Sequence, residues 1–294
     1  MSLTRISSGD MTATIDTAGA QLSSLTWQGR EYLWQKDPAY WAKSAPILFP
    51  VVGAAGDIPQ QSLAGPCQLA KHGFARDMTF LVHEQSANTD CTRFELSATP
   101  ETLAVYPYHF QLEVSFALDG QTLTQSFCIT NTGEYTMPFA IGGHPAFFAP
   151  IPDTADACFE DYDLIFSQSW TAQSPKVMAG GLLSYEEAYT VFENADSLAL
   201  TRDLFEFDTL ILSEVPDATV TLRGRRSGHG VRVDFADFDF LGVWSAPDAP
   251  FVALEPWSMH AATVGAPERL EEREHIILLE PGACDTRSFS ITLM

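Results

Sequence analysis

Basic residues are scarce in this chain of 294 residues: Lys and Arg together number 16, against 38 Asp and Glu. The formal net charge is −22 at pH 7, and the pI calculated from the sequence is about 4.4. Nucleic acids and anionic membrane surfaces would repel such a protein, so we expect neither of them as a partner. A neutral small molecule is compatible with this charge, and we expect most acidic side chains to form a solvated surface.

The chain also lacks signals for membrane insertion, secretion and disulfide formation. No apolar run approaches the roughly 20 residues that a membrane-spanning helix needs. The N-terminal segment MSLTRISSGDMTATI has no apolar core like that of a signal peptide. The five cysteines are odd in number, never spaced as CxxC, and scattered over Cys67, Cys91, Cys128, Cys158 and Cys284. This pattern favours reduced thiols over a disulfide framework or a zinc site, and we expect a cytoplasmic protein.

Helical periodicity is scarce as well, whereas short alternating segments are frequent. Over residues 111–118 apolar side chains at every second position share one face, and the alternation resumes over 123–129, after a tight turn at Asp119-Gly120. Similar segments are TATID, QLSSLTW, TRFELSA, ATVTLRG, VRVDF and RSFSITLM. Strands of this length, spaced by roughly 8–12 residues, predict an all-β fold, either a large sandwich or a barrel.

The remaining segments carry weaker predictions. Residues 266–275 (APERLEEREH) favour two or three helical turns and residues 201–207 favour one, while the irregular stretch 150–190 is expected to form long loops over a sheet. The basic segment RGRRSGHG (223–230) predicts a hairpin loop rather than a phosphate-binding loop. Because no linker, low-complexity stretch or repeat divides the chain, we expect residues 1–294 to form a single domain.

Several segments break the alternation with polar or titratable side chains next to Gly, Pro or aromatic residues. Four of them are 40–53, 71–80, 141–148 and 249–262, and a weaker fifth is 205–212. The candidate residues for chemistry within them are His72, Arg76, His144, Asp208, Glu255 and Trp257.

Glu255 follows the strand-like run FVAL and precedes Pro256. Proline is disfavoured inside a central strand, so we expect the strand to end here with the carboxylate at its mouth. Apolar neighbours would desolvate the carboxylate and raise its pKa, which suits a general base. An ion-paired or exposed glutamate at a strand end is the alternative that the spacing leaves open.

His144 lies in the segment AIGGHPAFFAP, between two glycines and a proline. Gly142 and Gly143 carry no Cβ and therefore let backbone or ligand approach closely, while Pro145 holds His144 extended. A histidine fixed beside aromatic side chains can donate a proton near neutral pH, because its ordinary pKa is about 6.5. A structural histidine that bonds a loop carbonyl is the alternative.

Other chemistries fit these residues less well. A zinc site would need three or four ligands from His72, His144, His260 and a carboxylate, but no HxH or HExxH pair occurs, so we expect no metal. Asp208 and Glu255 could form the carboxylate pair of a glycosidase, which would leave His144 without a role. The GxSxG motif of a Ser-His-Asp hydrolase is absent.

Taken together, these segments resemble the aldose 1-epimerase (galactose mutarotase-like) superfamily, and most closely its LacX-like branch. EYLWQKDPAYWAKSAPILFPVVG, KHGFARD, IGGHPAF, FDTLIL and APFVALEPW match that branch in order and relative placement, from about residue 10 to the C-terminus. HGFAR, GGHPAF and the glutamate of LEPW form a fairly specific set, whereas each alone would be weak. The resemblance implies a large antiparallel β-sandwich with few short helices and a sugar-binding cleft on one concave sheet.

The resemblance also implies roles for individual residues. In relatives the histidine of the second His motif is the general acid and the late glutamate is the general base, and these roles fall on His144 and Glu255. The earlier histidine, which binds the sugar near its ring, corresponds to His72. The aspartate that holds sugar hydroxyls corresponds to Asp208, with a looser match, and Arg76 of HGFAR is expected to help bind the substrate.

The implied reaction interconverts the α and β anomers of a hexose by ring opening and closure. Glu255 would remove the proton of the C1 hydroxyl while His144 protonates the ring oxygen, and no cofactor, metal or covalent intermediate is required. Trp41, Phe147 and Trp257 could stack on the apolar face of a pyranose, although for Trp41 a place in the sheet core is favoured.

Two alternatives stay open. A hexose-6-phosphate mutarotase would need a cationic pocket, to which Arg76 and Lys43 could contribute. A non-catalytic carbohydrate-binding or regulatory homologue would keep the cleft without turnover. LacX-like relatives often carry arginines where this chain has Lys43 and Ala54, and a lysine lacks the bidentate fork of an arginine. The loss at Ala54 favours the non-catalytic alternative, whereas the presence of His144 and Glu255 opposes it. Both a monomer and a homodimer are compatible with the sequence.

Overall fold

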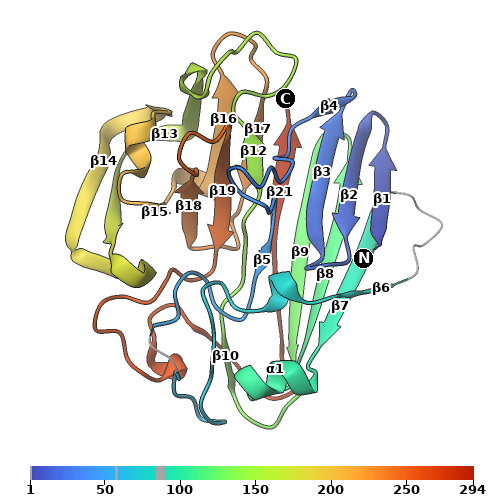
Figure 1. Ribbon diagram of the computed structural model, residues 1–294, viewed down its shortest axis with the longest axis vertical. Helices are drawn as coiled ribbons and strands as arrows, with labels where there is room; N and C mark the ends of the chain where they lie inside the picture. The colour runs from blue at the N-terminus through green and yellow to red at the C-terminus, as the bar shows by residue number, and fades with distance from the viewer. Residues whose placement is uncertain (1, 57–58, 84–89) are drawn as a thin grey trace.

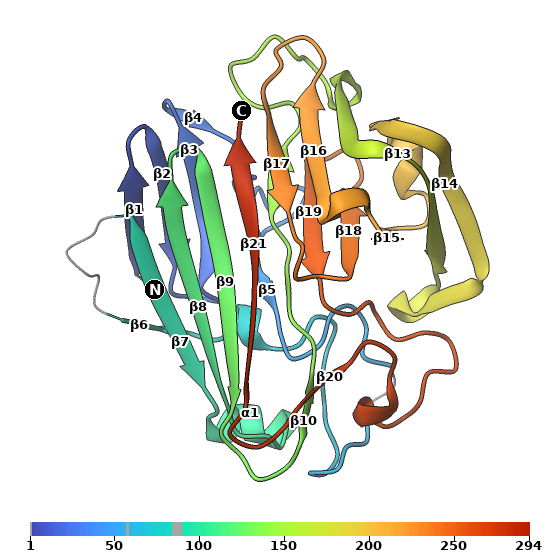
Figure 2. The same ribbon diagram turned by 180° about the vertical axis from the view of Figure 1, so that it is seen from behind.

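The computed structural model describes residues 2–56, 59–83 and 90–294, and its strands form two layers (Figure 1). One layer is a nine-stranded sheet in the order β14-β13-β16-β17-β21-β9-β8-β7-β6, which faces the viewer in Figure 2. The second layer contains a four-stranded sheet, β1-β2-β3-β4, beside a six-stranded sheet, β15-β18-β19-β11-β5, in which β12 also pairs with β19. The paired strands of these sheets run antiparallel, and the predicted all-β sandwich is confirmed.

The nine-stranded sheet consists of β6 (Leu81–Val82), β7 (Cys91–Ser97), β8 (Phe110–Asp119), β9 (Thr122–Asn131), β13 (Tyr162–Val177), β14 (Leu183–Ala199), β16 (Thr219–Gly224), β17 (Gly230–Asp234) and β21 (Cys284–Leu293). The six-stranded sheet consists of β5 (Ile47–Leu48), β11 (Gly142–Gly143), β12 (Ala146–Phe148), β15 (Leu210–Ser213), β18 (Phe240–Trp244) and β19 (Phe251–Trp257). The remaining strands are β1 (Leu3–Ser8), β2 (Met11–Asp16), β3 (Gln21–Trp27), β4 (Arg30–Glu31), and the pair β10 (Met137–Phe139) and β20 (Ile277–Leu279).

Helices are short and lie at the ends of the sandwich or between strands (Figure 1). They are α1 (Pro100–Val105) and the 3-10 turns η1 (Ala75–Asp77), η2 (Phe159–Asp161), η3 (Ala179–Gly181), η4 (Arg202–Phe205), η5 (Pro216–Ala218) and η6 (Leu270–Glu272). The single turn predicted over 201–207 is present as η4. Within the described ranges, no helix has the length and apolar character needed to cross a membrane.

The hydrophobic core fills the space between the layers. β8 and β9 form the predicted hairpin, in which every second side chain is buried and Gly120, at φ +58°, occupies the turn. Phe116 of β8 packs edge-to-face on Phe94 of β7, with ring centroids 5.9 Å apart. Burial of each such aromatic side chain stabilises the fold by about 1.5–3 kcal/mol.

The prediction of long loops over residues 150–190 is wrong. β13 and β14 pair as a long hairpin at the edge of the nine-stranded sheet, on the left of Figure 1. Their pairing register shifts at several points, among them between Ile165 and Trp170 and between Ser174 and Lys176. Because each bulge interrupts the alternation of inward and outward side chains, these strands leave no clear period of two in the sequence.

The two or three helical turns expected over 266–275 are also wrong, since only η6 forms there. The backbone of this segment pairs with a distant one instead. Gln61 N donates to Glu268 O at 3.1 Å, and Leu270 N donates to Gln61 O at 2.9 Å. Tertiary hydrogen bonds therefore override the local helix propensity of this Glu-rich segment.

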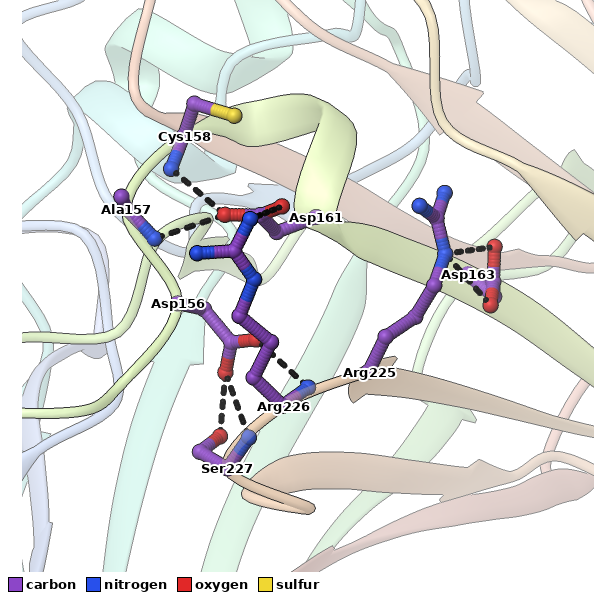
Figure 3. A network of polar contacts seen from close by, with 8 residues as sticks. All are labelled: Asp156, Ala157, Cys158, Asp161, Asp163, Arg225, Arg226 and Ser227. Carbon is purple, nitrogen blue, oxygen red and sulfur yellow. Dashed lines mark hydrogen bonds and ion pairs between the residues drawn. The ribbon is translucent and has the colours of Figure 1, made fainter.

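The basic segment 223–230 forms the hairpin between β16 and β17, as predicted. Figure 3 shows the three aspartates that lie against it, Asp156, Asp161 and Asp163. Arg225 Nε donates to both oxygens of Asp163, at 3.0 and 2.9 Å. Arg226 Nη2 lies 3.4 Å from Asp161, and its backbone N–H donates to Asp156 at 2.9 Å. Both arginines are thus engaged by carboxylates, as expected for a structural loop rather than a phosphate site.

Candidate active site

Glu255 lies in the central strand of the six-stranded sheet. β19 continues through Pro256 to Trp257, so the prediction that the strand ends at Glu255 is wrong. On the edge that faces β11 and β12, the N–H groups of Leu254 and Ser258 each donate to a backbone carbonyl at 3.0 Å. The missing N–H of Pro256 falls between these two bonds, at the break between β11 and β12. The proline is tolerated there because it removes a single bond where the ladder is already interrupted.

Trp257 lies on the same face of β19 as Glu255, since the two residues are separated by two positions. A Cβ atom on Gly142 of β11 would meet Trp257 Cδ1 at 2.8 Å, and one on Gly242 of β18 would meet Cζ2 at 2.5 Å. Both distances are shorter than a van der Waals contact. Glycines on the two neighbouring strands therefore make room for the indole beside the carboxylate.

His144 lies between the short strands β11 and β12, and its backbone N–H donates to Pro46 O at 3.1 Å. Trp41 stacks on its ring, with centroids 4.7 Å apart and planes 26° apart. Trp244 contacts the same ring edge-on, with centroids 5.7 Å apart. Trp41 is partly buried: it packs against a small buried cluster that includes Phe251, as favoured for it, and it also lines the cavity, whereas Phe147 is fully buried in the core.

The structure brings His144 and Glu255 into direct contact: the distance from Nε2 to Oε2 is 3.1 Å. Both side chains are buried, with 9% and 1% of their surface exposed, yet both line a cavity of about 270 Å³. The other lining residues are Trp41, Gly53, Lys71, His72, Arg76, Val177, Gly181, Leu183, Asp208, Thr209, Ile211, Trp244, Trp257 and Ala261. All five predicted site residues, from four separate segments of the chain, thus line one cavity.

Burial moves the pKa values of the two contacting groups in opposite directions. It raises the pKa of Glu255 well above its ordinary value, and the charge of Lys71 only partly opposes this shift. It lowers the pKa of His144 to about 3, because an imidazolium would lose its hydration there. These opposite shifts both favour the neutral forms, a protonated Glu255 carboxyl and a neutral His144 imidazole. Among the described residues, neither His144 Nδ1 nor Glu255 Oε2 has a hydrogen-bond partner, so the two groups lie in contact without forming a hydrogen bond.

His72 is fixed by two hydrogen bonds with Gly53. His72 N donates to Gly53 O at 2.8 Å, and Gly53 N donates to His72 Nδ1 at 3.1 Å. Because Nδ1 accepts, the neutral ring carries its proton on Nε2. Burial, assisted by the nearby His144, lowers the pKa of His72 well below its ordinary value, so the ring is neutral. It can therefore donate Nε2–H to a ligand oxygen.

Charged groups line the exposed part of the cavity. Arg76 Nη2 donates to Lys71 O at 2.9 Å, which holds the guanidinium at the wall. Asp208 is exposed, adopts φ +71°, and accepts a hydrogen bond from the Thr209 hydroxyl at 3.0 Å. Cations and a carboxylate with free acceptor positions are suited to binding hydroxyl groups.

The two positions where arginines were expected from relatives do not supply cations to the cavity. Lys43 Nζ forms an ion pair with Asp77 at 2.8 Å and is not among the lining residues. Ala54 is buried with 8% of its surface exposed, against the wall formed by Gly181. Lys71, which precedes His72 in KHGFAR, is the lysine that lines the cavity.

Sequence reasoning missed part of the cavity wall. Trp244 follows the apolar run FLGV of β18, where it has the pattern of an ordinary strand residue. Val177, Gly181 and Leu183 come from the end of the bulged β13–β14 hairpin, whose strands were not predicted. Lys71 precedes the predicted residue His72, and this position in the KHGFAR segment was a signal that the other members of this set lack.

The three histidines considered for a zinc site do not meet. The rings of His72 and His144 are 5.8 Å apart, but His260 lines a different cavity. His144 Nε2 lies 3.1 Å from Glu255 Oε2, and His72 Nδ1 accepts from the backbone N–H of Gly53, so each ring already has one nitrogen next to a protein group.

Comparisons with known proteins agree with this fold. A model of the family described as Aldose 1-epimerase matches residues 2–262. Protein LacX of Lactococcus lactis subsp. lactis, in its plasmid and chromosomal forms, is 36% identical over 293 residues, which covers 97% of this chain and 97% of the relative.

Two solved structures are similar over the whole chain. A galactose mutarotase related enzyme from Lactobacillus acidophilus has a TM-score of 0.91 at 28% identity, covering 100% of this chain and 97% of that chain. A galactose mutarotase-like protein from Lactobacillus casei has a TM-score of 0.88 at 30% identity, with 100% of both chains covered.

Proposed function

The chain belongs to the aldose 1-epimerase family, and we propose that it interconverts the α and β anomers of a hexose, with His144 and Glu255 as the proton-transferring pair. The observation that carries this proposal is the contact of 3.1 Å between the two groups inside the cavity. The C1 hydroxyl and the ring oxygen of a pyranose are bonded to the same carbon. Two adjacent groups can therefore reach both oxygens at once.

Ring opening requires one base and one acid. Glu255, as the carboxylate, takes the proton of the C1 hydroxyl, and C1–O becomes a carbonyl as the bond from C1 to the ring oxygen breaks. His144, as the imidazolium, protonates the departing ring oxygen. After rotation about the C1–C2 bond, the reverse transfers close the ring on the other face. Each positioned proton transfer contributes about 10²–10⁴ in rate.

The protonation states in this cycle match the shifts in the pKa values of the pair. A ring-opened sugar leaves Glu255 protonated and His144 neutral, which are the forms that burial favours. Sugar hydroxyls that donate to Glu255 favour the carboxylate, and the negative charge of this carboxylate, 3.1 Å from His144 Nε2, favours the imidazolium. His72 Nε2–H and the Asp208 carboxylate hold further sugar oxygens, and Arg76 extends the binding wall.

Polarimetry on freshly dissolved α-glucose and α-galactose tests the proposal. We expect the protein to accelerate equilibration, and Glu255→Gln and His144→Asn each to reduce the acceleration by about 10²–10⁴. His109→Asn, which changes an exposed histidine outside the cavity, is the matched control and keeps full activity. Saturable sugar binding without acceleration in the wild type would instead identify a carbohydrate-binding module.

A 6-phosphorylated hexose is the second candidate substrate, and Lys71 favours it. Lys71 lines the cavity together with Arg76, and none of the ion pairs found among the described residues involves it. In that case acceleration would be restricted to glucose 6-phosphate, and Lys71→Met would raise the KM for it. Equal acceleration of glucose and glucose 6-phosphate by both proteins would exclude this candidate.

A further inference from the structure

A second cavity of about 610 Å³ lies next to the candidate active site and shares no lining residue with it. His260 contributes to its wall, while the next residue, Ala261, lines the candidate active site. The segment that follows β19 thus separates the two cavities. The second cavity also contains Tyr185, Phe240, Glu274 and His275.

His260 is buried in an orientation that leaves one nitrogen without a partner. The residue is 2% exposed, and its Nδ1 lies 2.7 Å from Ala261 O. A carbonyl oxygen only accepts, so Nδ1 carries the proton and Nε2 presents its lone pair. Among the described residues, Nε2 has no hydrogen-bond partner. An unpaired buried polar atom costs about 1–3 kcal/mol, so a ligand for Nε2 would relieve a real penalty.

Two more ligand groups meet His260 at this point. One ligand atom each from His260, Glu274 and His275 lie within 4.8 Å of one another. The rings of His260 and His275 are 5.5 Å apart, and both pack edge-on against Phe240 at 4.9 Å. Glu274 and His275 are exposed and follow η6, so their side chains can adjust while His260 stays fixed.

We propose that His260, His275 and Glu274 bind a divalent first-row transition metal ion, for which Zn²⁺ is the probe. Two imidazole nitrogens and one carboxylate oxygen form a three-ligand set that zinc accepts, with water as the fourth ligand. The bond from His260 Nδ1–H to a backbone carbonyl is the outer interaction that orients metal-binding histidines. This site differs from the set of histidines considered in the sequence, where no metal was expected.

The three ligand atoms need to move only slightly closer together to bind zinc. Tetrahedral zinc, with bonds of about 2.0–2.1 Å, places its ligand atoms about 3.3 Å apart. The present limit of 4.8 Å therefore shrinks by about 1.5 Å, through movement of the two exposed side chains.

A bound ion would link two segments that are distant in the sequence. One is the segment after β19, which carries Ala261, and the other is the loop between η6 and β20. Ala262 N already donates to Ala54 O, and Leu183 N donates to Ala262 O, at 2.8 and 2.9 Å. The ion would reinforce this junction beside the candidate active site, and its role is therefore structural.

Titration of metal-free protein without a histidine tag tests the site. The background is Cys128→Ser/Cys284→Ser, because those two thiols lie 3.1 Å apart and could bind zinc themselves. We expect one Zn²⁺ per chain by calorimetry, a higher Tm with Zn²⁺, and the visible absorption of tetrahedral Co²⁺ when Co²⁺ replaces it.

Glu274→Gln and His275→Asn change exposed side chains and are expected to fold, and each should weaken Zn²⁺ binding at least 10-fold. His109→Asn, an exposed histidine at another place, should leave binding unchanged. The proposal is overturned if the background protein binds no Zn²⁺ at micromolar concentration, or if binding is unaffected by both variants.

Discussion

Replacing His144 with Asn should change how the stability of the protein depends on pH. Burial lowers the pKa of this imidazole to about 3, from an ordinary value of 6.5. Between these two pH values the unfolded chain binds a proton at His144 that the folded chain does not bind. The free energy of unfolding therefore falls as the pH falls from 6.5 toward 3, and this group has no such effect above pH 6.5.

The size of this loss of stability follows from the shift in the pKa of His144. At pH 5 His144 is protonated in the unfolded chain. In the folded protein this pH lies about two units above the pKa of about 3, so the ring is neutral. The loss at pH 5 is then about 1.5 pH units times about 1.4 kcal/mol, or about 2 kcal/mol. Asn has no titrating proton, so the variant lacks this loss. Between pH 7.5 and pH 5, His144→Asn should lose about 2 kcal/mol less stability than the wild type.

Urea unfolding at pH 7.5, 6 and 5, followed by tryptophan fluorescence, measures how much stability the wild type and His144→Asn each lose as the pH falls. His109→Asn serves again as control, because His109 is exposed, and should follow the wild-type curve. Other titrating groups contribute to all three proteins and largely cancel in the comparison. Equal pH dependence of wild type and His144→Asn would refute the lowered pKa of the folded imidazole, because His144 would then bind protons alike in the folded and unfolded chains.

Two further predictions concern neighbouring residues. Burial raises the pKa of Glu255 from 4.5, so the stability associated with this group is complete below pH 4.5 and is lost as the pH rises through the raised value. Glu255→Gln should therefore have a higher Tm than the wild type at pH 7.5 but not at pH 4, and a lower Tm at pH 7.5 would contradict this. Gly242→Ala places a Cβ atom 2.5 Å from the Trp257 ring. It should cost about 1–3 kcal/mol and weaken sugar binding, whereas an unchanged urea midpoint would show that the indole moves freely.

Much of the fold could be predicted because alternation reports directly which face of a strand is buried. The β8–β9 hairpin and the strand β2 follow the alternating pattern closely. The β13–β14 hairpin could not be predicted, since its bulges break the period of two. α1 was missed although Thr99 and Thr102 form a capping box around Pro100. It is a single short helix, and its apolar pattern is too brief to detect.

The candidate site could be predicted to a similar extent. Gly and Pro next to His144 and Glu255 pointed to unusual backbone, and both residues line the cavity. The strand end proposed at Pro256 was wrong because the sequence does not show which edge of a strand carries a break. Contacts between distant segments, such as Trp41 on His144, depend on the tertiary fold and leave no local signal.

The features that make this site costly for folding are those that favour proton transfer. A carboxyl and an imidazole that contact each other in a buried wall lose hydration, and His144 Nδ1 and Trp257 Nε1 have no partners among the described residues. Each unpaired polar group costs about 1–3 kcal/mol, which a hydroxyl-rich ligand can recover by supplying donors and acceptors. Because the pKa values of the pair are shifted in opposite directions, binding that favours the carboxylate also favours the imidazolium next to it. In the proposed mechanism, ligand binding and activation of the acid–base pair are thus one process, and a wall of apolar residues at these positions would be more stable but unable to perform it.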